Sequence, residues 1–349
     1  MKEIQGFPIP QKNYYKVYVN TITYNQSQYI EDCLNGVAKQ TTTFPFVHHV
    51  IDDASIDGEQ EVIKAWMMRE CNMDKAEYYD NDICNIILAP NKNNINCTVA
   101  AYLLKKNLYR EPKKKEALYK PWRDVCPYEA LCEGDDYWID SKKLQKQVDF
   151  MESNPMCSLY FCNAKVQNVN NLPCSMEHGK IEDREYNASE VFKSWCVPTA
   201  SVIFKKEILD IELRSPERFM FGDIAVILRA ERFGKVFGSS ETMVVYRINH
   251  GGVTQDSLHL ESFIRRRPQH IECIIDNFGD IMDIDYLKND LCLSYCNKAV
   301  ITHPLGEKIS DYLHAFMAKK KIAMNFIIHV TILNNIKSIL KRMFQIFFR

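Results

Sequence analysis

The sequence predicts an α/β protein whose β-sheet is mostly parallel, and two observations lead to this prediction. Strand-like and helix-like segments follow one another in strict turn through the first half of the 349-residue chain. Such alternation implies right-handed crossovers, which place the strands parallel and the helices on the faces of the sheet. Two pairs of carboxylates, Asp52–Asp53 and Asp135–Asp136, each come directly after a strand-like segment. Because these sheets bind ligands beyond the carboxyl ends of their strands, both pairs are expected at one edge.

The first half of the chain supplies these elements in order. The segment 16–24 is β-branched and aromatic, which is typical of a buried strand. In the segment 29–40, Ile30, Cys33, Leu34 and Val37 recur at helical spacing and predict an amphipathic helix. Further strands are expected over residues 44–55, 85–90, 128–134 and 157–164, and further helices over residues 59–70, 98–109 and 142–154. Asp140 and Ser141 cap the last of these helices, and Pro155 ends it.

The second half of the chain changes character. Residues 165–186 are polar and rich in asparagine, and they are expected to form a flexible loop. A strand over 199–206, a helix over 222–234 and a strand leading into a loop over 241–252 follow, and from Ser257 onward the pattern is helical throughout. We therefore expect a catalytic domain over residues 1–255 and a helical C-terminal region over 256–349.

The composition excludes several classes of protein. With 46% hydrophobic and 26% charged residues and a net charge of −1, the chain is an ordinary globular protein and not a nucleic-acid binder. The N-terminus lacks the apolar stretch of a signal peptide, and no run reaches the roughly 18 apolar residues of a membrane span. The thirteen cysteines have irregular spacing and lie mostly in apolar runs, so they are expected to be reduced structural thiols. These features indicate a cytoplasmic protein.

The motifs of several common α/β enzymes are absent. The glycines form neither G-x-G-x-x-G nor G-x-x-x-x-G-K-[ST], and the turn after the first buried strand, TYNQSQY, contains no glycine. Neither H-E-x-x-H nor G-x-S-x-G occurs. Carboxylates remain, and they suit Mg²⁺ or Mn²⁺, which are usually bound through one or two carboxylates and the phosphates of a substrate. A pair of aspartates at a strand end is therefore consistent with a metal and a bound diphosphate.

Three stretches of the chain resemble the motifs of family 2 glycosyltransferases. They are VNTITYNQSQYIEDCLNGVAKQT, VIDDAS and CEGDDYWIDSKKLQKQVDFMESNP, and the similarity extends over residues 16–254 in the order of the family. The resemblance implies a GT-A fold, with a Rossmann-like sheet flanked by helices. It also implies transfer of a sugar, with inversion, from a nucleotide-diphosphate donor with the help of a divalent metal held at an Asp-Asp motif.

The resemblance assigns roles to individual residues. Thr23 and Asp53 match positions that recognise the nucleotide base, Asp135 matches the position near the ribose, and Asp136 matches the ligand of Mn²⁺ or Mg²⁺. Asp223, at the start of an expected helix, matches the catalytic base that takes the proton of the acceptor hydroxyl. Arg247 and His250, in the stretch YRINHGG, match the loop that closes on the diphosphate.

Simpler roles exist for these side chains. The Asp135–Asp136 pair could be a solvated turn before a helix, Asp53 could cap a turn through its side chain, and Asp223 could be a helix N-cap. Tyr137 and Trp138 could stack on the sugar or pack in the core. His48 and His49 lie inside a strand and are expected to be packed. The run Lys113–Lys115 is expected to be a solvated loop.

The predicted activity is the transfer of a single sugar from a nucleotide-diphospho-sugar, with a UDP-sugar favoured as donor. The Q-x-x-R-W signature of processive synthases is absent, which favours single addition. The acceptor is expected to be a hydroxyl group of a glycan or a lipid-linked molecule in the synthesis of surface polysaccharide or glycoconjugate. Two alternatives stay open: a sugar-phosphate nucleotidyltransferase, and an inactive module that binds a nucleotide sugar or serves as a scaffold.

The C-terminal tail differs from the rest of the chain. From Lys319 to Arg349 it contains seven Lys or Arg residues and no acidic residue. From Ile332 to Phe347, bulky apolar residues recur at helical spacing and leave the basic groups on another face. Such a helix can lie on an anionic membrane surface, so we expect peripheral contact with the inner face of the membrane. The alternative is a helix that packs on the catalytic domain.

Overall fold

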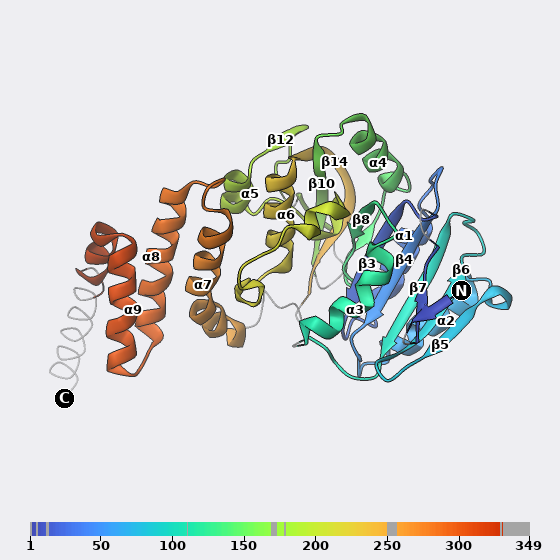
Figure 1. The fold of residues 1–349 in the computed structure, drawn as a ribbon, viewed down its shortest axis with the longest axis horizontal. Helices are drawn as coiled ribbons and strands as arrows, with labels where there is room; N and C mark the ends of the chain where they lie inside the picture. The colour runs from blue at the N-terminus through green and yellow to red at the C-terminus, as the bar shows by residue number, and fades with distance from the viewer. Residues whose placement is uncertain are drawn as a thin grey trace. The chain divides into compact units, whose positions relative to one another are not determined.

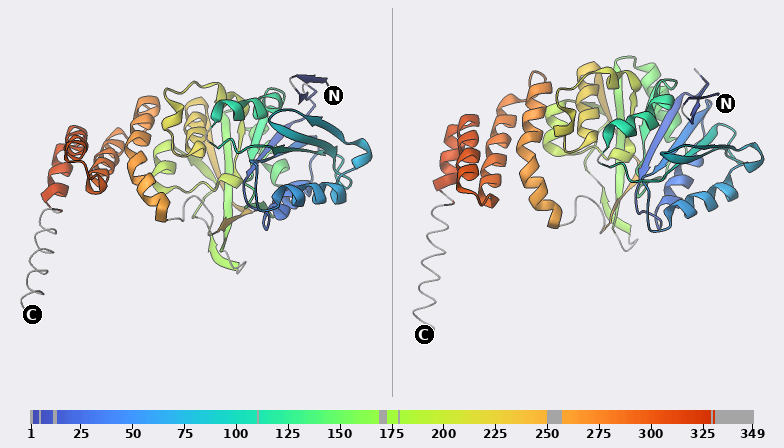
Figure 2. Two further views of the ribbon diagram at one scale, coloured as in Figure 1. Left: turned by 90° about the horizontal axis from the view of Figure 1, so that it is seen from below. Right: turned by 60° about the horizontal axis from the view of Figure 1, so that its bottom comes forward.

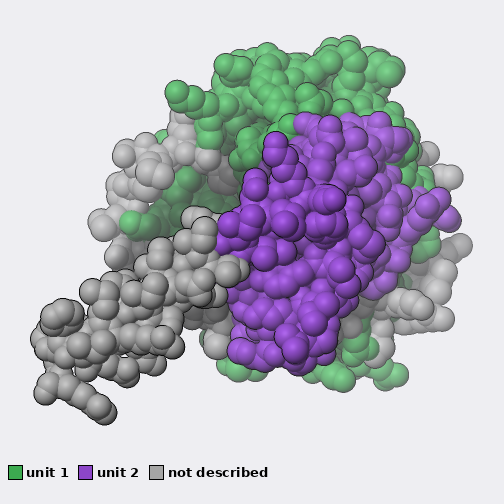
Figure 3. Space-filling model, turned by 90° about the vertical axis from the view of Figure 1, so that its left-hand side faces the viewer, with its two compact units in different colours: residues 1–211, 226–249 green, residues 212–225, 250–349 purple. Residues whose placement is uncertain are grey.

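The protein consists of two compact units, which are distinguished by colour in Figure 3. The computed structural model describes residues 2–4, 6–11, 14–109, 111–168, 173–177, 179–249, 257–328 and 330. The first unit comprises residues 1–211 and 226–249, and the second comprises residues 212–225 and 250–349. The helix α6 (Gly222–Phe233) starts in the second unit and continues in the first. The second unit therefore includes a stretch of the expected catalytic domain, whose assignment to residues 1–255 stays a prediction.

A mixed β-sheet forms the centre of the first unit (Figure 1). Its middle strands lie in the order β8 (Tyr128–Leu131), β3 (Val17–Thr23), β4 (Phe46–Asp52) and β7 (Cys97–Leu104), and all of them run parallel. Every residue of β4 is buried, as expected for a parallel strand covered on both faces. The carboxyl ends of β3, β4 and β8 therefore meet at one edge of the sheet.

Further strands extend the sheet on both sides. On one side, β6 (Cys84–Pro90) and β5 (Glu77–Asp80) continue antiparallel from β7. On the other side, β13 (Ile203–Lys205) lies between β8 and β10 (Cys157–Asn168) and is antiparallel to both. The strand β10 in turn runs parallel to β14 (Lys235–Ile248). The short strands β9 (Tyr137–Trp138), β11 (Pro173–Glu177) and β12 (Arg184–Tyr186) pair with β14, β10 and β14, respectively. A separate hairpin joins β1 (Lys2–Ile4) and β2 (Phe7–Ile9).

Helices cover both faces of the sheet because alternate side chains of each strand point to opposite faces. The helices α1 (Ile30–Ala38), α2 (Glu59–Glu70) and α4 (Lys143–Ser153) bury their apolar stripes against one face. The helix α3 (Pro112–Arg123) packs its tryptophan and tyrosine against the other face, which includes Tyr18 and Tyr102. A third apolar cluster joins α5 (Ala188–Ser194) and α6 to β10. The predicted α/β architecture is confirmed, although the sheet is mixed.

Three local predictions were wrong. Residues 98–109 were expected to be a helix, but most of them form β7 and the turn after it. A central strand buried on both faces reads as a continuous apolar run, which periodicity alone does not distinguish from a buried helix. The expected loop over 165–186 contains the end of β10 and the strands β11 and β12. The run Lys113–Lys115 lies in the helix α3 and not in a loop.

The second unit is helical, as expected from Ser257 onward. The helices α7 (Ser257–Phe278), α8 (Ile284–Ile301) and α9 (Leu305–Ala318) pack in chain order, α7 on α8 and α8 on α9 (Figure 2). No helix in the part of the chain that the structure describes is long and apolar enough to cross a membrane. The predicted tail helix falls largely on residues 331–349, which lie outside the described residues.

The cysteines agree with the expectation of structural thiols. Twelve of the thirteen cysteines are free thiols in the structure, and of these twelve all except Cys196 are buried. Burial raises the pKa of the Cys97 thiol, so this residue behaves as a small apolar side chain.

Candidate active site

The carboxyl ends of β3, β4 and β8 bring the predicted residues of the first unit together. Thr23 is the last residue of β3, and its carbonyl oxygen accepts the N–H of Asp53 at 3.0 Å. The N–H of Gly134, after β8, is 3.3 Å from the carbonyl oxygen of Ile22. A Cβ atom on Gly134 would clash with the Thr23 side chain, so the close approach of the two segments requires glycine. The sheet edge therefore carries both aspartate pairs, as the sequence predicts.

The Thr23 hydroxyl donates to the carboxylate of Glu59, a residue that was not predicted from the sequence. Glu59 is fully buried at the start of α2 and also accepts hydrogen bonds from the N–H of Gln26 (2.8 Å) and from the hydroxyl of Ser55 (2.9 Å). Burial raises the pKa of Glu59. Its position at a helix start is the only signal in the sequence, and that position is common for Glu.

Asp53 holds a neighbouring turn in place. Its carboxylate accepts the N–H of Leu108 at 2.6 Å, and its carbonyl oxygen accepts from the Asn107 side chain at 2.9 Å. Asp53 is buried, so this structural role agrees with the simpler interpretation of the residue. Its contact with the nucleotide base stays a prediction. The neighbouring Asp52 accepts from the Ser55 N–H (3.0 Å) and from the Gln60 side chain (2.6 Å).

The second aspartate pair lies between β8 and β9 and is bound by groups from the end of β14. Oδ1 of Asp136 accepts the backbone N–H of Arg247 at 2.8 Å, and Oδ2 of Asp135 accepts from the Asn249 side chain at 2.6 Å. Asp136 is only 2% exposed. Burial, and then the charges of Asp135 and Glu133, raise the pKa of Asp136 well above its ordinary value. Burial also raises the pKa of Asp135, against the opposing effects of Asn249 and Arg247.

Arg247 lies in β14 and not in the loop predicted from the sequence. Its guanidinium donates to the carbonyl oxygen of Asp135 (3.1 Å) and to the side chain of Gln167 (3.2 Å), and it pairs with Asp32 of α1. The rings of Tyr29 and Tyr137 lie 5.0 and 4.4 Å from the guanidinium carbon. The cation is thus fixed beside the aspartate pair.

The aromatic residues after the pair have different surroundings. Tyr137 is half-buried against Arg247. Trp138 is buried, its indole N–H donates to the carbonyl oxygen of Ala200 at 2.8 Å, and the ammonium of Lys143 lies 3.9 Å from its ring. Trp138 is therefore a core residue. His48 and His49 are also fully buried, with hydrogen bonds to Thr21 and Tyr18, as expected for packed side chains.

The aspartate pair has the donor chemistry that a hard divalent cation requires. Among the described residues, no group of three or more His, Cys, Asp or Glu is arranged to hold a metal ion. Two carboxylates are sufficient when substrate phosphates supply further ligands. The side-chain amide of Asn249 offers one further oxygen ligand beside the two carboxylates. Its Oδ1 is buried and has no hydrogen-bond partner within the described part of the chain. The residues therefore fit Mg²⁺ or Mn²⁺. His250 lies outside the described residues.

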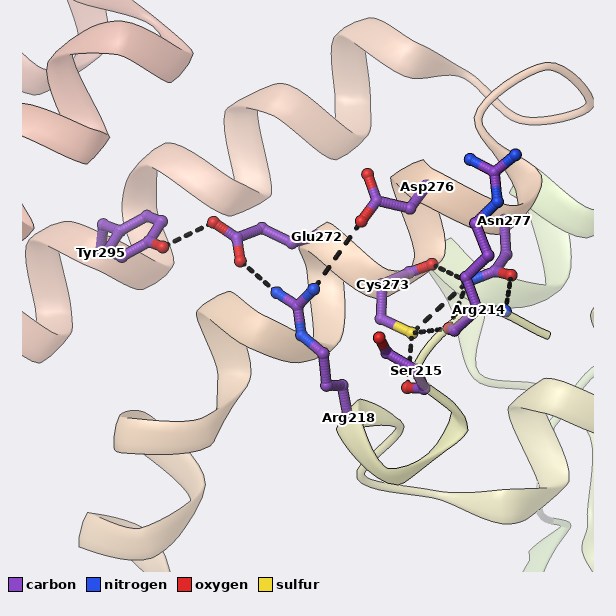
Figure 4. Close-up of polar contacts among 8 residues, drawn as sticks. All are labelled: Arg214, Ser215, Arg218, Glu272, Cys273, Asp276, Asn277 and Tyr295. Atoms are coloured by element: carbon purple, nitrogen blue, oxygen red, sulfur yellow. Dashed lines mark hydrogen bonds and ion pairs between the residues drawn. The ribbon is translucent and has the colours of Figure 1, made fainter.

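Asp223 belongs to the second unit and is the second residue of α6. The N–H of the next residue, Ile224, donates to its Oδ1 at 2.7 Å. The carboxylate is half-buried. The segment before Asp223 contacts α7: Arg218 of this segment forms an ion pair with Glu272 of α7 (Figure 4). Its role as base stays a prediction.

The comparison with protein families identifies one match. Residues 18–83 match the model of the family described as Glycosyl transferase family 2. This region contains β3, α1, β4 and α2, and therefore Thr23 and Asp53.

Two further comparisons extend over most of the chain. The uncharacterized proteins Rv1520 of Mycobacterium tuberculosis and Mb1547 of Mycobacterium bovis are each 26% identical to this chain over 233 residues. These residues are 67% of this chain and 59% of each relative, so the match spans less than two thirds of the relatives' length. Residues 1–349 of Staphylococcus aureus TarS, in complex with UDP, are similar with a TM-score of 0.53 and 16% identity, over 89% of this chain and 83% of that chain. A second structure of the same TarS fragment gives a TM-score of 0.51 at 16% identity, over 88% and 82%.

The family match concerns residues 18–83, whereas the similarity in fold extends over most of the chain. The matched region confirms the predicted similarity to family 2 glycosyltransferases, and the similarity to the TarS structures confirms the GT-A type of fold. Residues 18–83 are therefore similar to the glycosyltransferases of family 2, and the fold is similar to that of the TarS structures.

Proposed function

We propose that the protein is an inverting glycosyltransferase that moves a single sugar from a nucleotide-diphospho-sugar to a hydroxyl group. The observation that carries the proposal is the Asp135–Asp136 pair after β8, in which Asp136 is buried, next to the fixed guanidinium of Arg247. Carboxylates with raised pKa values favour a cation as a partner, and a sugar nucleotide brings a diphosphate that shares this cation. The UDP named with the TarS structure supports a UDP-sugar as the favoured donor.

Each residue has one part in the proposed reaction. Asp135 and Asp136 would hold Mn²⁺ or Mg²⁺, which neutralises charge on the departing diphosphate. The Arg247 guanidinium keeps Asp135 in place through its carbonyl oxygen and adds positive charge beside the pair. Thr23 and Asp53 would fix the base of the nucleotide. Asp223 would accept the proton of the acceptor hydroxyl as that oxygen attacks the anomeric carbon.

Two alternatives have weaker support. A sugar-phosphate nucleotidyltransferase would be expected to carry a glycine-rich loop after β3, where this chain has TYNQSQY. An inactive binding module would not need the acidic positions that the chain retains. We therefore favour catalysis.

The donor is tested by thermal unfolding against a panel of UDP- and GDP-sugars with and without Mn²⁺. A donor that binds the folded state raises the midpoint by mass action. We expect at least one sugar nucleotide to raise the midpoint only with Mn²⁺ present, and the same donor to release its nucleoside diphosphate. Binding without any release would favour the inactive module, and absence of binding to every donor would refute the proposal.

The acceptor side includes a membrane contact. The face of α9 opposite its buried side exposes Leu305, Ile309, Leu313 and Met317, each 51–74% exposed. The run Lys319–Lys321 follows this apolar stripe directly, and the tail beyond it is basic. This arrangement supports peripheral binding at an anionic cytoplasmic membrane face, where a lipid-linked or surface-glycan acceptor would be available. The full chain is expected to sediment with anionic vesicles at low salt but not with neutral vesicles. Sedimentation with neither would contradict the proposal.

A further inference from the structure

The segment that leads to Asp223 is attached along one face of α7. Residues 214–221 precede α6 in the sequence, but they belong to the same compact unit as the C-terminal helices. They include a short 3₁₀ turn, Pro216–Arg218, which contacts α7. Figure 4 shows how the side chains of α7 lie against this segment.

Polar contacts fix the start of the segment. Asn277 binds the backbone of Arg214 twice: its Oδ1 accepts the N–H at 2.7 Å, and its Nδ2 donates to the carbonyl oxygen at 3.1 Å. The thiol of Cys273 lies 3.4 Å from the carbonyl oxygens of both Arg214 and Ser215 (Figure 4). Ser215 has a positive φ of 50°, a conformation that is uncommon for a residue other than glycine. These contacts from α7 hold the turn in this conformation.

An ion pair fixes the middle of the segment. The guanidinium of Arg218 pairs with Glu272 and lies 3.7 Å from the carboxylate of Asp276, one turn further along α7. The other oxygen of Glu272 accepts from the hydroxyl of Tyr295 on α8 at 2.6 Å (Figure 4). Arg218 and Glu272 are each about 30% exposed, so the pair is partly shielded from water.

A buried histidine fixes the end of the segment. Nδ1 of His270 accepts the backbone N–H of Met220 at 3.3 Å, and the rings of Phe219 and Phe221 lie 5.9 and 6.0 Å from its ring. His270 is 1% exposed, and burial, followed by nearby arginines, lowers its pKa to about 4. The ring is therefore neutral at neutral pH and can accept this hydrogen bond. Asp223 follows Phe221 by two residues.

We propose that α7 positions Asp223, through the contacts of His270, Glu272, Cys273, Asp276 and Asn277 with residues 214–221. This inference rests on the proposed role of Asp223 as the base. Because α6 begins at Gly222, directly after the attached segment, these contacts fix both the first turn of α6 and the direction of the Asp223 carboxylate. Displacing a reacting group by about 1 Å can cost about 100-fold in rate. The C-terminal helices thus serve the chemistry and not only the packing of the unit.

The test compares two arginines that form ion pairs with different elements. In Arg218→Met, the ion pair between the segment and Glu272 of α7 is lost, while the contacts of His270, Cys273 and Asn277 remain. In the control, Arg267→Met, an arginine of α7 loses its pair with Asp290 of α8 (2.7 Å), which does not involve the segment. We expect similar small decreases in the unfolding midpoint for both variants. Only Arg218→Met should lower kcat for release of nucleoside diphosphate from the donor, by about 10- to 100-fold with the donor KM unchanged, and Arg218→Lys should recover part of the loss.

A second pair of measurements separates this inference from the role of Asp223. In an Asp223→Asn background, Arg218→Met should lower kcat no further, since a positioning residue acts only through the group it positions. Amide hydrogen exchange over residues 215–224 should accelerate in Arg218→Met and not in Arg267→Met. Equal kcat for the two arginine variants, or additive losses with Asp223→Asn, would overturn the positioning role. If Asp223→Asn alone retained full kcat, the assignment of the base would fail instead.

Discussion

Replacement of Asp136 by asparagine tests the centre of the proposed site. The amide keeps an oxygen that can accept the Arg247 N–H, now 2.8 Å from Oδ1, but it removes the buried carboxylate next to Asp135. Removal of one group that stabilises the charge of a transition state usually costs about 100- to 1,000-fold in rate, or about 3–4 kcal/mol, and we expect a loss at least this large here. We therefore expect Asp136→Asn to lose sugar transfer and the Mn²⁺-dependent shift in unfolding midpoint, and to keep its fold.

The stability of the same variant has a predicted sign. The pKa of Asp136 is raised in the folded protein above its ordinary value of 3.8, mainly by burial. The folded state therefore holds the proton of Asp136 more tightly than the unfolded state does. As a consequence, the contribution of Asp136 to the free energy of unfolding falls as the pH rises toward its folded pKa. Without metal, Asp136→Asn should unfold at a higher midpoint than the wild type at pH 7.5, by on the order of 1–3 kcal/mol of unfolding free energy. The difference should shrink toward pH 4.

The assay follows the release of nucleoside diphosphate from the donor, together with thermal unfolding at several pH values with and without Mn²⁺. Asp52→Asn is the matched control, because Asp52 is also a buried aspartate at a strand end and has no proposed metal contact. The control should keep the Mn²⁺-dependent midpoint shift. Wild-type turnover and an intact Mn²⁺ response in a folded Asp136→Asn variant would refute the reasoning.

The remaining predictions concern the base, one glycine and one buried histidine. Asp223→Asn should lower kcat by about two to four orders of magnitude with the donor KM unchanged, and a loss confined to donor binding in steady-state kinetics would make it a structural residue. Gly134→Ala should cost about 1–3 kcal/mol of unfolding free energy in urea titrations, because the new Cβ would clash with Thr23. The control is Gly306→Ala, whose Cβ would meet no atom within 4 Å and should cost nothing. Burial lowers the pKa of His48 from 6.5 to about 3. As the pH falls below about 6.5, His48 is protonated in the unfolded state but not in the folded state, so the free energy of unfolding decreases. His48→Gln should reduce that fall in urea titrations between pH 7 and pH 5, and an unchanged pH dependence would contradict the argument.

Some elements were predictable from sequence because their patterns are local. The helix α2 (Glu59–Glu70) has the predicted bounds, and the strands β3 and β4 lie within the predicted segments. Both acidic pairs follow strands whose carboxyl ends meet at one edge, so their position in the fold was implied by the alternation of strand and helix alone. The strand β7 was mistaken for a helix because its burial depends on its neighbours β4 and β6.

The sequence by itself determined the class of fold, the family resemblance and the aspartates at the sheet edge, since each of these is recorded in short stretches of residues. Only the tertiary structure decided what each aspartate contacts. Asp136 meets Arg247 from 111 positions away, Asp53 meets Leu108 from 55, and Arg218 meets Glu272 from 54. Glu59 and Asn249 were missed for the same reason, because their partners Thr23 and Asp135 lie 36 and 114 positions away in the sequence. Hydrogen bonds and ion pairs depend on distances of a few ångströms in space, and chain folding sets those distances between residues whose separation in sequence carries no such information.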